Sequence, residues 1–264
     1  MGCLRVVLLA ALLVLAAVSA EAKPQEPIKI GLRDVIDTVE ISYRQLSDVT
    51  AGFFQRSTMA NTQKEFRAEG EMFLKPPAGG DPVKFRFDYF RPTSQQIVTD
   101  GRTLWIYLPE NRQVILSDVS FIFTPFGQDP NHPERSRASN FLQGLGRISQ
   151  DFLVTFSPQF QDMDGNYILE LEPRTATAFI EKLFIVVRRD SVINFVRNRS
   201  SFMTTNRPEL LFPILSSTVT DHQGNTTTME FTGIRTNTRL PSMTFEFLIP
   251  AGVDVVKPPA ERTL

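Results

Sequence analysis

The amino-acid sequence predicts an α+β fold in which antiparallel β-strands predominate. About ten short alternating segments follow one another at spacings of roughly 8–12 residues, which is typical of all-β sandwiches and barrels. The predicted order is helix, strands, helix, strands, so no βαβ unit is present and the sheet should be antiparallel. The third observation is the composition, since the chain holds 22 Phe but 1 Trp and 4 Tyr. Excess Phe fits either a wide apolar surface lining a space or a Phe-rich solid core, and composition does not separate the two.

The first residues predict export. Arg5 supplies a short positive region, residues 6–18 are an almost unbroken run of Val, Leu and Ala, and Ala20-Glu21-Ala22 is a small-x-small cleavage site. The apolar run of about 13 residues has the length of a signal-peptide core and is short of the roughly 20 residues that span a bilayer. We therefore expect residues 1–22 to be a cleaved signal peptide and residues 23–264 to form a single domain. A retained membrane anchor is the alternative.

The chemistry-bearing residues of the chain predict no catalytic or metal site. Cys3, the single cysteine, precedes the cleavage site, so a mature chain has no disulfide and no thiolate. His132 and His222 do not have the spacing of metal ligands, and the sequence contains neither a Gly-x-Ser-x-Gly elbow nor a glycine-rich phosphate loop before a helix. The formal net charge of −1 argues against a general polyanion binder. We expect no enzyme, no metal, no cofactor and no nucleic-acid partner.

Residues 32–46 predict the first helix. Apolar side chains recur at spacings of three and four without an interrupting Gly or Pro, and they are Leu32, Val35, Ile36, Val39, Tyr43 and Leu46. Such a helix either packs permanently on a sheet or covers a cavity, and periodicity alone leaves both open.

Strands follow this helix. We expect them over residues 50–57, 66–75, 83–91, 95–99, 103–108 and 113–117. The alternation is clearest in the third, where Phe85, Phe87 and Tyr89 share one face. Three aromatic side chains on one side of one strand must cover something apolar. Asp100-Gly101, between two alternating segments, predicts a hairpin turn.

The middle of the chain changes character before further strands begin. Residues 124–139 are rich in Pro and charged residues, which predicts a long irregular loop. Phe141, Leu142, Leu145 and Ile148 then recur at helical spacing, which fits either a movable lid or an ordinary surface helix. Further strands are expected over residues 152–156, 166–172, 182–188, 218–221, 226–234 and 242–248, before a Pro-rich tail.

Several segments resemble the LolA family of periplasmic outer-membrane lipoprotein carriers. The similarity runs over most of residues 35–256, and its most specific part is the Asp-Gly-x-Thr-Leu-Trp core at residues 100–105. The segments that carry it are residues 70–75 with Pro77, residues 85–89 ending at Pro92, residues 97–107, residues 221–231 and residues 245–253.

The resemblance implies a fold and a function. The fold is an incomplete, open β-barrel of about eleven strands, covered by helices that form a lid. The implied function is a monomeric periplasmic carrier that binds the acyl chains of lipoproteins in a hydrophobic cavity. It would take them from an inner-membrane ABC release complex and pass them to an outer-membrane acceptor. The alternative is a lipid- or lipoprotein-sensing regulator with the same half-barrel, and a periplasmic hydrolase is a third reading.

The resemblance also implies site residues. The acyl-cavity residues are Phe85, Phe87, Tyr89, Ile97, Phe54 and Met72, and the lid residues are Phe141, Leu142, Leu145 and Val39. Two departures from the family pattern stand out. Pro76 occupies the place of the family arginine that hydrogen-bonds the lid closed, so the latch is either absent or supplied by another residue. Residues 192–211 form an extra insertion, either a lengthened hairpin or loop, or a basic, aromatic projection that contacts a membrane or a partner.

Overall fold

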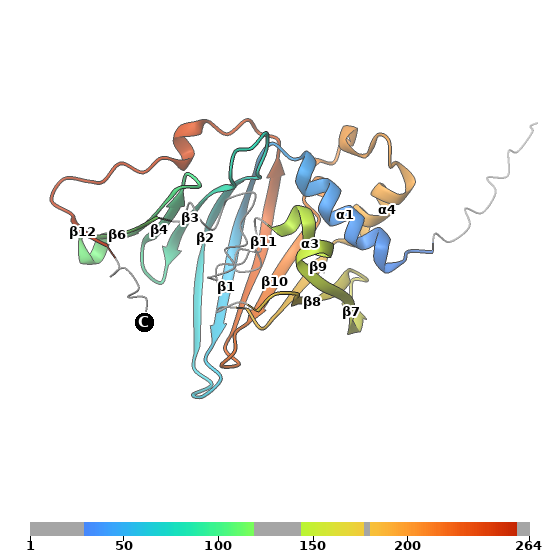
Figure 1. Ribbon diagram of the computed structural model, residues 1–264, viewed down its shortest axis with the longest axis horizontal. Coiled ribbons are helices and arrows are strands. Elements are labelled where there is room, and N and C mark those ends of the chain that lie inside the picture. The colour runs from blue at the N-terminus through green and yellow to red at the C-terminus, as the bar shows by residue number, and fades with distance from the viewer. Residues whose placement is uncertain (1–28, 119–143, 177–179, 258–264) are drawn as a thin grey trace, which may run out of the picture.

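The computed structural model describes residues 29–118, 144–176 and 180–257 and shows within them one curved, open sheet of twelve strands (Figure 1). The strands are β1 Val49–Thr58, β2 Glu65–Lys75, β3 Lys84–Arg91, β4 Gln95–Thr99, β5 Thr103–Leu108, β6 Gln113–Asp118, β7 Phe152–Gln161, β8 Tyr167–Pro173, β9 Lys182–Val187, β10 Ile214–Thr220, β11 Thr226–Thr236 and β12 Asp254–Val256. They lie in the order β12-β6-β5-β4-β3-β2-β1-β11-β10-β9-β8-β7.

Helical segments occupy the remaining ordered parts of the described chain. They are the α-helices α1 Leu32–Gln45, α3 Ile148–Asp151 and α4 Arg189–Arg197, and the 3₁₀-helices η1 Pro109–Asn111, η4 Leu145–Arg147, η5 Phe202–Thr204, η6 Pro208–Leu211 and η7 Ser242–Phe245. None of the helices in the described ranges is long and apolar enough to span a membrane.

The sheet confirms the predicted fold class. Neighbouring strands run antiparallel, apart from β6 and β12, which pair in parallel, and the sheet does not close into a barrel. The described strands number twelve rather than about eleven. Local chemistry sets the hairpin turns as expected. At the β4–β5 turn, the Asp100 carboxylate accepts hydrogen bonds from the backbone N–H groups of Arg102 and Thr103, and Gly101 adopts a φ of 90°.

The three α-helices cover only part of one face of the sheet, which we call the inner face. Figure 1 shows α1, α3 and α4 gathered over strands β7 to β11, and no α-helix of the described residues lies over β3 to β6. The apolar stripe of α1 is buried as its spacing predicted, with Val35 and Val39 in the same core cluster as Leu169 and Ile185 of the sheet. We call β7 to β11 the covered half and β3 to β6 the open half.

The strand expected over residues 242–248 is absent, and η7 followed by extended chain stands there instead. The alternation that suggested a strand is present at residues 245–248, since Phe245 is buried and Phe247 is partly buried, whereas Glu246 and Leu248 are exposed. It arises because the segment lies across the outer face of the open half, where the Phe247 ring is centred 5.6 Å from that of Tyr107. Side-chain packing therefore replaces ladder hydrogen bonds, and Pro241 and Pro250 bracket the segment.

The connection between β11 and β12 (residues 237–253, here the C-terminal connection) runs from the middle of the sheet to its far edge (Figure 1). Its start is fixed by Asp48, whose carboxylate accepts hydrogen bonds from the backbone N–H groups of Thr238, Arg239 and Leu240. Its end places β12, within the expected Pro-rich tail, beside β6. Sequence alone missed this strand because three residues paired to a distant edge have no local pattern.

Residues 189–213, between β9 and β10, hold α4, η5 and η6. The expected insertion at residues 192–211 falls within this stretch. The stretch joins β9 to β10, which pair antiparallel, so it lengthens the connection of a strand pair. Its aromatic residues do not project outward, because Phe195 and Phe202 are buried and their rings pack edge to face, with centroids 5.3 Å apart. Arg199 joins the stretch to α1 through ion pairs with Asp34 at 3.3 Å and Asp37 at 3.7 Å.

Candidate functional site

The strand register brings most of the predicted cavity residues onto the inner face. On β3, Phe87 lies opposite Met72 of β2 on one side and Ile97 of β4 on the other. Phe85 and Tyr89 flank Phe87 at alternate positions of the same strand, so they share its face. The five residues therefore form one continuous apolar surface across three strands, which we call the aromatic face.

Phe53 of β1 completes the aromatic face, although the sequence did not single it out. Its ring packs edge to face against Phe87, with centroids 5.6 Å apart, and against Tyr89 at 4.9 Å. The ring reaches over β2 at Gly70, where an added Cβ would lie 2.7 Å from Phe53 Cζ and 2.1 Å from the Asp88 carbonyl oxygen. Glycine at this position is what lets side chains of β1 and β3 meet across β2.

Phe54, which was predicted to lie with these residues, is on the opposite face of the sheet. Its neighbour Phe53 points inward and is 1% exposed, so alternation turns Phe54 to the outer face, where it is 53% exposed. Two consecutive Phe residues gave the sequence no basis for choosing between them. The register with β2 and β11 decides the choice.

The aromatic face is buried unevenly. Met72 and Phe87 are 0% and 8% exposed and belong to the core. Phe85, Tyr89, Ile97 and Leu104 are only partly buried and pack at the edge of that core. The open half therefore presents an apolar floor that nothing in the described residues covers fully. Such a surface is a candidate site for an apolar ligand.

The predicted lid residues in the described chain are buried in the core. Val39 of α1 and Leu145 of η4 are each 1% exposed and belong to the main core cluster. Phe141 and Leu142 lie outside the described residues. The segment 144–151 is held to α1 by polar contacts: Glu40 accepts hydrogen bonds from Ser149 N at 2.8 Å and Ser149 Oγ at 2.7 Å, and the Arg44 guanidinium donates to the Gly146 carbonyl.

A chain of hydrogen bonds continues the aromatic face along β1. Tyr89 Oη donates to Gln55 Oε1 at 2.9 Å, Gln55 Nε2 donates to Ser57 Oγ at 3.3 Å, and Ser57 Oγ lies 3.1 Å from Thr227 Oγ1. Burial raises the pKa of the Tyr89 hydroxyl to about 12, so it remains protonated and acts as a donor. We call these four side chains the polar strip. No local pattern in the sequence indicates it, because its members come from three separate strands.

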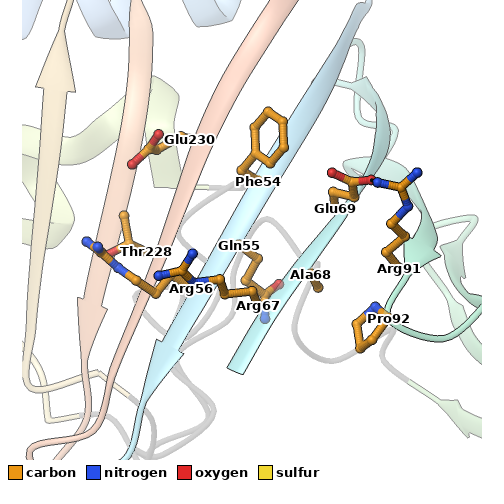
Figure 2. A pocket seen from close by; sticks show the side chains of 10 residues that line it. All are labelled: Phe54, Gln55, Arg56, Arg67, Ala68, Glu69, Arg91, Pro92, Thr228 and Glu230. Carbon is orange, nitrogen blue, oxygen red and sulfur yellow. Dashed lines mark ion pairs between the residues drawn. The ribbon is translucent and has the colours of Figure 1, made fainter. Parts of the chain in front are cut away.

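A pocket of about 820 Å³ lies where β3 ends and β2 continues (Figure 2). The β2–β3 ladder extends from Lys75 to Glu69 on β2, so Arg67 and Ala68 have no β3 partner. The pocket is therefore lined from both faces of the sheet. Gln55 and Ala68 come from the inner side, and the other lining residues are Phe54, Arg56, Arg67, Glu69, Arg91, Pro92, Thr228 and Glu230.

No group of three or more His, Cys, Asp and Glu side chains among the described residues is placed to hold a metal ion. The acids of the β7–β8 turn serve the turn, since Asp162 accepts hydrogen bonds from Asp164 N at 3.0 Å and Asn166 N at 2.8 Å. What the site offers is apolar surface, a short polar strip and charged groups at the pocket rim.

The chain is similar in sequence to a known protein family and to several of its members. The family model described as "Outer membrane lipoprotein carrier protein LolA" matches residues 44–206. An outer-membrane lipoprotein carrier protein of Methylobacillus flagellatus is 25% identical over 223 residues, covering 84% of this chain and 89% of the relative. One from Bordetella avium is 29% identical over 206 residues, covering 78% and 79%. A LolA superfamily structure from Nitrosomonas europaea is 13% identical and covers 83% of this chain and 99% of that chain, with a TM-score of 0.36.

Proposed function

The chain belongs to the LolA family of outer membrane lipoprotein carrier proteins, and from this premise we propose that it carries lipoproteins by holding their acyl chains on the aromatic face. The observation that supports this assignment is the partly exposed apolar floor of Phe85, Tyr89, Ile97 and Leu104. Burying one methylene group stabilises a complex by roughly 0.8 kcal/mol, so about ten methylenes supply roughly 8 kcal/mol, which corresponds to micromolar affinity. A carrier needs no catalytic group for this task.

The route of the cargo is part of the proposal. We propose that residues 1–22 direct export to the periplasm and that the mature chain acts there as a monomer with a single domain. It receives lipoproteins from an inner-membrane ABC release complex and delivers them to an outer-membrane acceptor. The alternative role is a regulator that senses lipid or mislocalised lipoprotein with the same surface.

The lid is the second part of the proposal. We assign it to α1 together with the segment 144–151, because Val39 and Leu145 lie between these helices and the sheet. Pro76 has no side-chain donor to latch such a lid. Glu40 and Arg44 are the substitutes that the contacts favour, since both side chains of α1 hydrogen-bond to the segment 144–151. In this assignment, opening separates the segment from α1 and exposes the covered part of the inner face.

The test uses the mature protein from residue 23 and a purified triacylated lipoprotein. We expect native mass spectrometry to show a one-to-one complex, and we expect the lipoprotein to move to acceptor outer membranes when these are added. A regulator would bind the lipoprotein but release none to the acceptor membranes. The control is the same lipoprotein without its acyl chains. If the mature protein binds neither the acylated nor the acyl-free lipoprotein, the result contradicts both roles.

A further inference from the structure

We propose that the polar strip of Gln55, Ser57, Tyr89 and Thr227 binds the carbonyl oxygens of the ester and amide groups that join acyl chains to a lipid-modified protein. This inference rests on the carrier function proposed above and adds a specificity to the same site. It explains why polar side chains lie next to the apolar residues of the aromatic face.

The position of the strip fits the polar end of an acylated ligand. Phe53, Gln55 and Ser57 occupy alternate positions of β1, so the inner face changes along this strand from aromatic to polar. Tyr89 belongs to both regions, because its ring packs on Phe53 and its hydroxyl donates to Gln55. An acyl chain lying on the aromatic face therefore has its linking groups beside the strip.

The small side chain of Ala68 and the absence of one at Gly70 make this arrangement possible. Gln55 lies opposite Ala68 in the β1–β2 ladder, and Phe53 lies opposite Gly70. With no bulk at these positions of β2, the Tyr89 side chain of β3 crosses to Gln55 of β1. The side chain of Gln55 also lines the pocket at the end of β3 (Figure 2), so the strip is accessible from the pocket.

The count of hydrogen-bond donors indicates the kind of ligand. Gln55 Nε2 has two hydrogens, and one of them is directed to Ser57. The hydroxyls of Ser57 and Thr227 have two hydrogens between them, and their mutual contact uses one. No other described residue accepts the remaining two hydrogens, so these donors can serve a ligand, whereas Gln55 Oε1 already accepts from Tyr89. A ligand that offers acceptor oxygens satisfies these donors.

The charge of the strip favours a neutral acceptor over an anion. All four side chains are uncharged at neutral pH, where a tyrosine hydroxyl is protonated, and burial raises the pKa of Tyr89 further. Arg67, on the same strand as Ala68, belongs to the outer face and is paired with Glu65. Moving a carboxylate or phosphate onto a strip without a paired cation carries a large desolvation cost, whereas an ester or amide carbonyl carries a small one. Carbonyl oxygens of lipid linkages combine the required acceptors with the apolar chains.

The experiment compares two synthetic lipopeptides with identical chains, a diester and a diether in which each ester carbonyl is replaced by a methylene. We expect the mature wild-type protein to bind the diester about tenfold more tightly, because each hydrogen bond contributes modestly. Gln55→Leu should bind both ligands with equal affinity. The matched control, Gln96→Leu, alters a partly buried glutamine on the outer face of β4 and should keep the tenfold preference.

The outcomes separate this inference from the carrier function. Tight binding of both ligands by the wild type without a preference, or a preference retained by Gln55→Leu, overturns the polar strip as the carbonyl site and leaves the carrier function standing. Failure of the wild type to bind either ligand contradicts both. Should Gln55→Leu not fold, judged by its thermal unfolding, Tyr89→Phe keeps the ring, removes the hydrogen bond to Gln55 and should reduce the preference.

Discussion

The two halves of the sheet are covered on opposite faces, and this difference explains where a ligand site can form. In the covered half, helices bury the inner face, so that Leu169, Leu183 and Ile185 are each 0% exposed. In the open half, the C-terminal connection lies on the outer face, against Trp105 and Tyr107, and leaves the inner face partly exposed. One half is thus a packed core, whereas the other has apolar side chains that the described part of the chain leaves partly exposed.

The largest expected difference between the halves is the loss of stability when a leucine is shortened to alanine. Leu169→Ala in the covered half should lower the free energy of unfolding by about 3 kcal/mol, because it leaves a cavity in a closed core. Leu104→Ala in the open half should cost about 1 kcal/mol, because its side chain is already partly exposed. Urea denaturation of both variants measures the difference. Equal losses would mean that the open half is as tightly packed as the covered half.

The next largest effect should be a loss of ligand affinity when the apolar floor of the open half is altered. Phe85→Asp places a charge on the apolar floor and should weaken the binding of a triacylated lipopeptide by about 10- to 100-fold, through the loss of apolar contact. Phe85 is better suited to this test than Phe87, whose ring is held by both Phe53 and Phe85. Isothermal titration gives the affinity. Binding as tight as that of the wild type would show that the floor is ordinary core edge.

The C-terminal connection joins the halves, and its anchor should respond to acid. Burial raises the pKa of the Asp48 carboxyl, but hydrogen bonds from Thr238, Leu240 and Ser47 outweigh burial and leave the pKa below its usual range. Because the folded state holds the lower pKa, the stabilisation is present above the unfolded value of about 4 and is lost as pH falls through the folded pKa.

Removing this anchor tests the same point. Asp48→Ala should lower the free energy of unfolding by about 1–2 kcal/mol at pH 7, since partly buried N–H groups lose their acceptor. Thermal unfolding should show this loss at pH 7 and a smaller one at pH 3. A loss that stays constant between these pH values would rule out the ionised carboxylate as its source.

The smallest effect should come from the contact between α1 and the segment after α4. The Arg199 side chain that pairs with Asp34 and Asp37 is 58% exposed, so solvent screens these ion pairs. Arg199→Ala should therefore cost about 1 kcal/mol or less, and less again at 1 M salt. Hydrogen exchange of α1 amides should rise only slightly. A loss above 2 kcal/mol would show that α1 is held to the covered half mainly by charge rather than by its buried apolar stripe.

Local patterns in the sequence were sufficient for most elements of both halves. The helix α1 follows from apolar spacing, and the strands β3 to β5 follow from alternation and the Asp100-Gly101 turn, because these signals come from neighbouring residues. The helix α4 was not predicted, although Val192 and Phe195 of its buried face are three residues apart. The helix is short and lies between β9 and β10, which pair with each other, so a hairpin connection was expected there.

The aromatic face shows what the sequence by itself determined: alternation alone placed Phe85, Phe87 and Tyr89 on one side. Tertiary structure decided the rest. The strand register turns Phe53 rather than Phe54 to the inner face, and Gly70 lets side chains of β1 and β3 meet across β2. Residues 242–248 pack on the outer face instead of pairing in the sheet. The physical reason is that register and coverage depend on contacts between residues far apart in the chain, which no local period records.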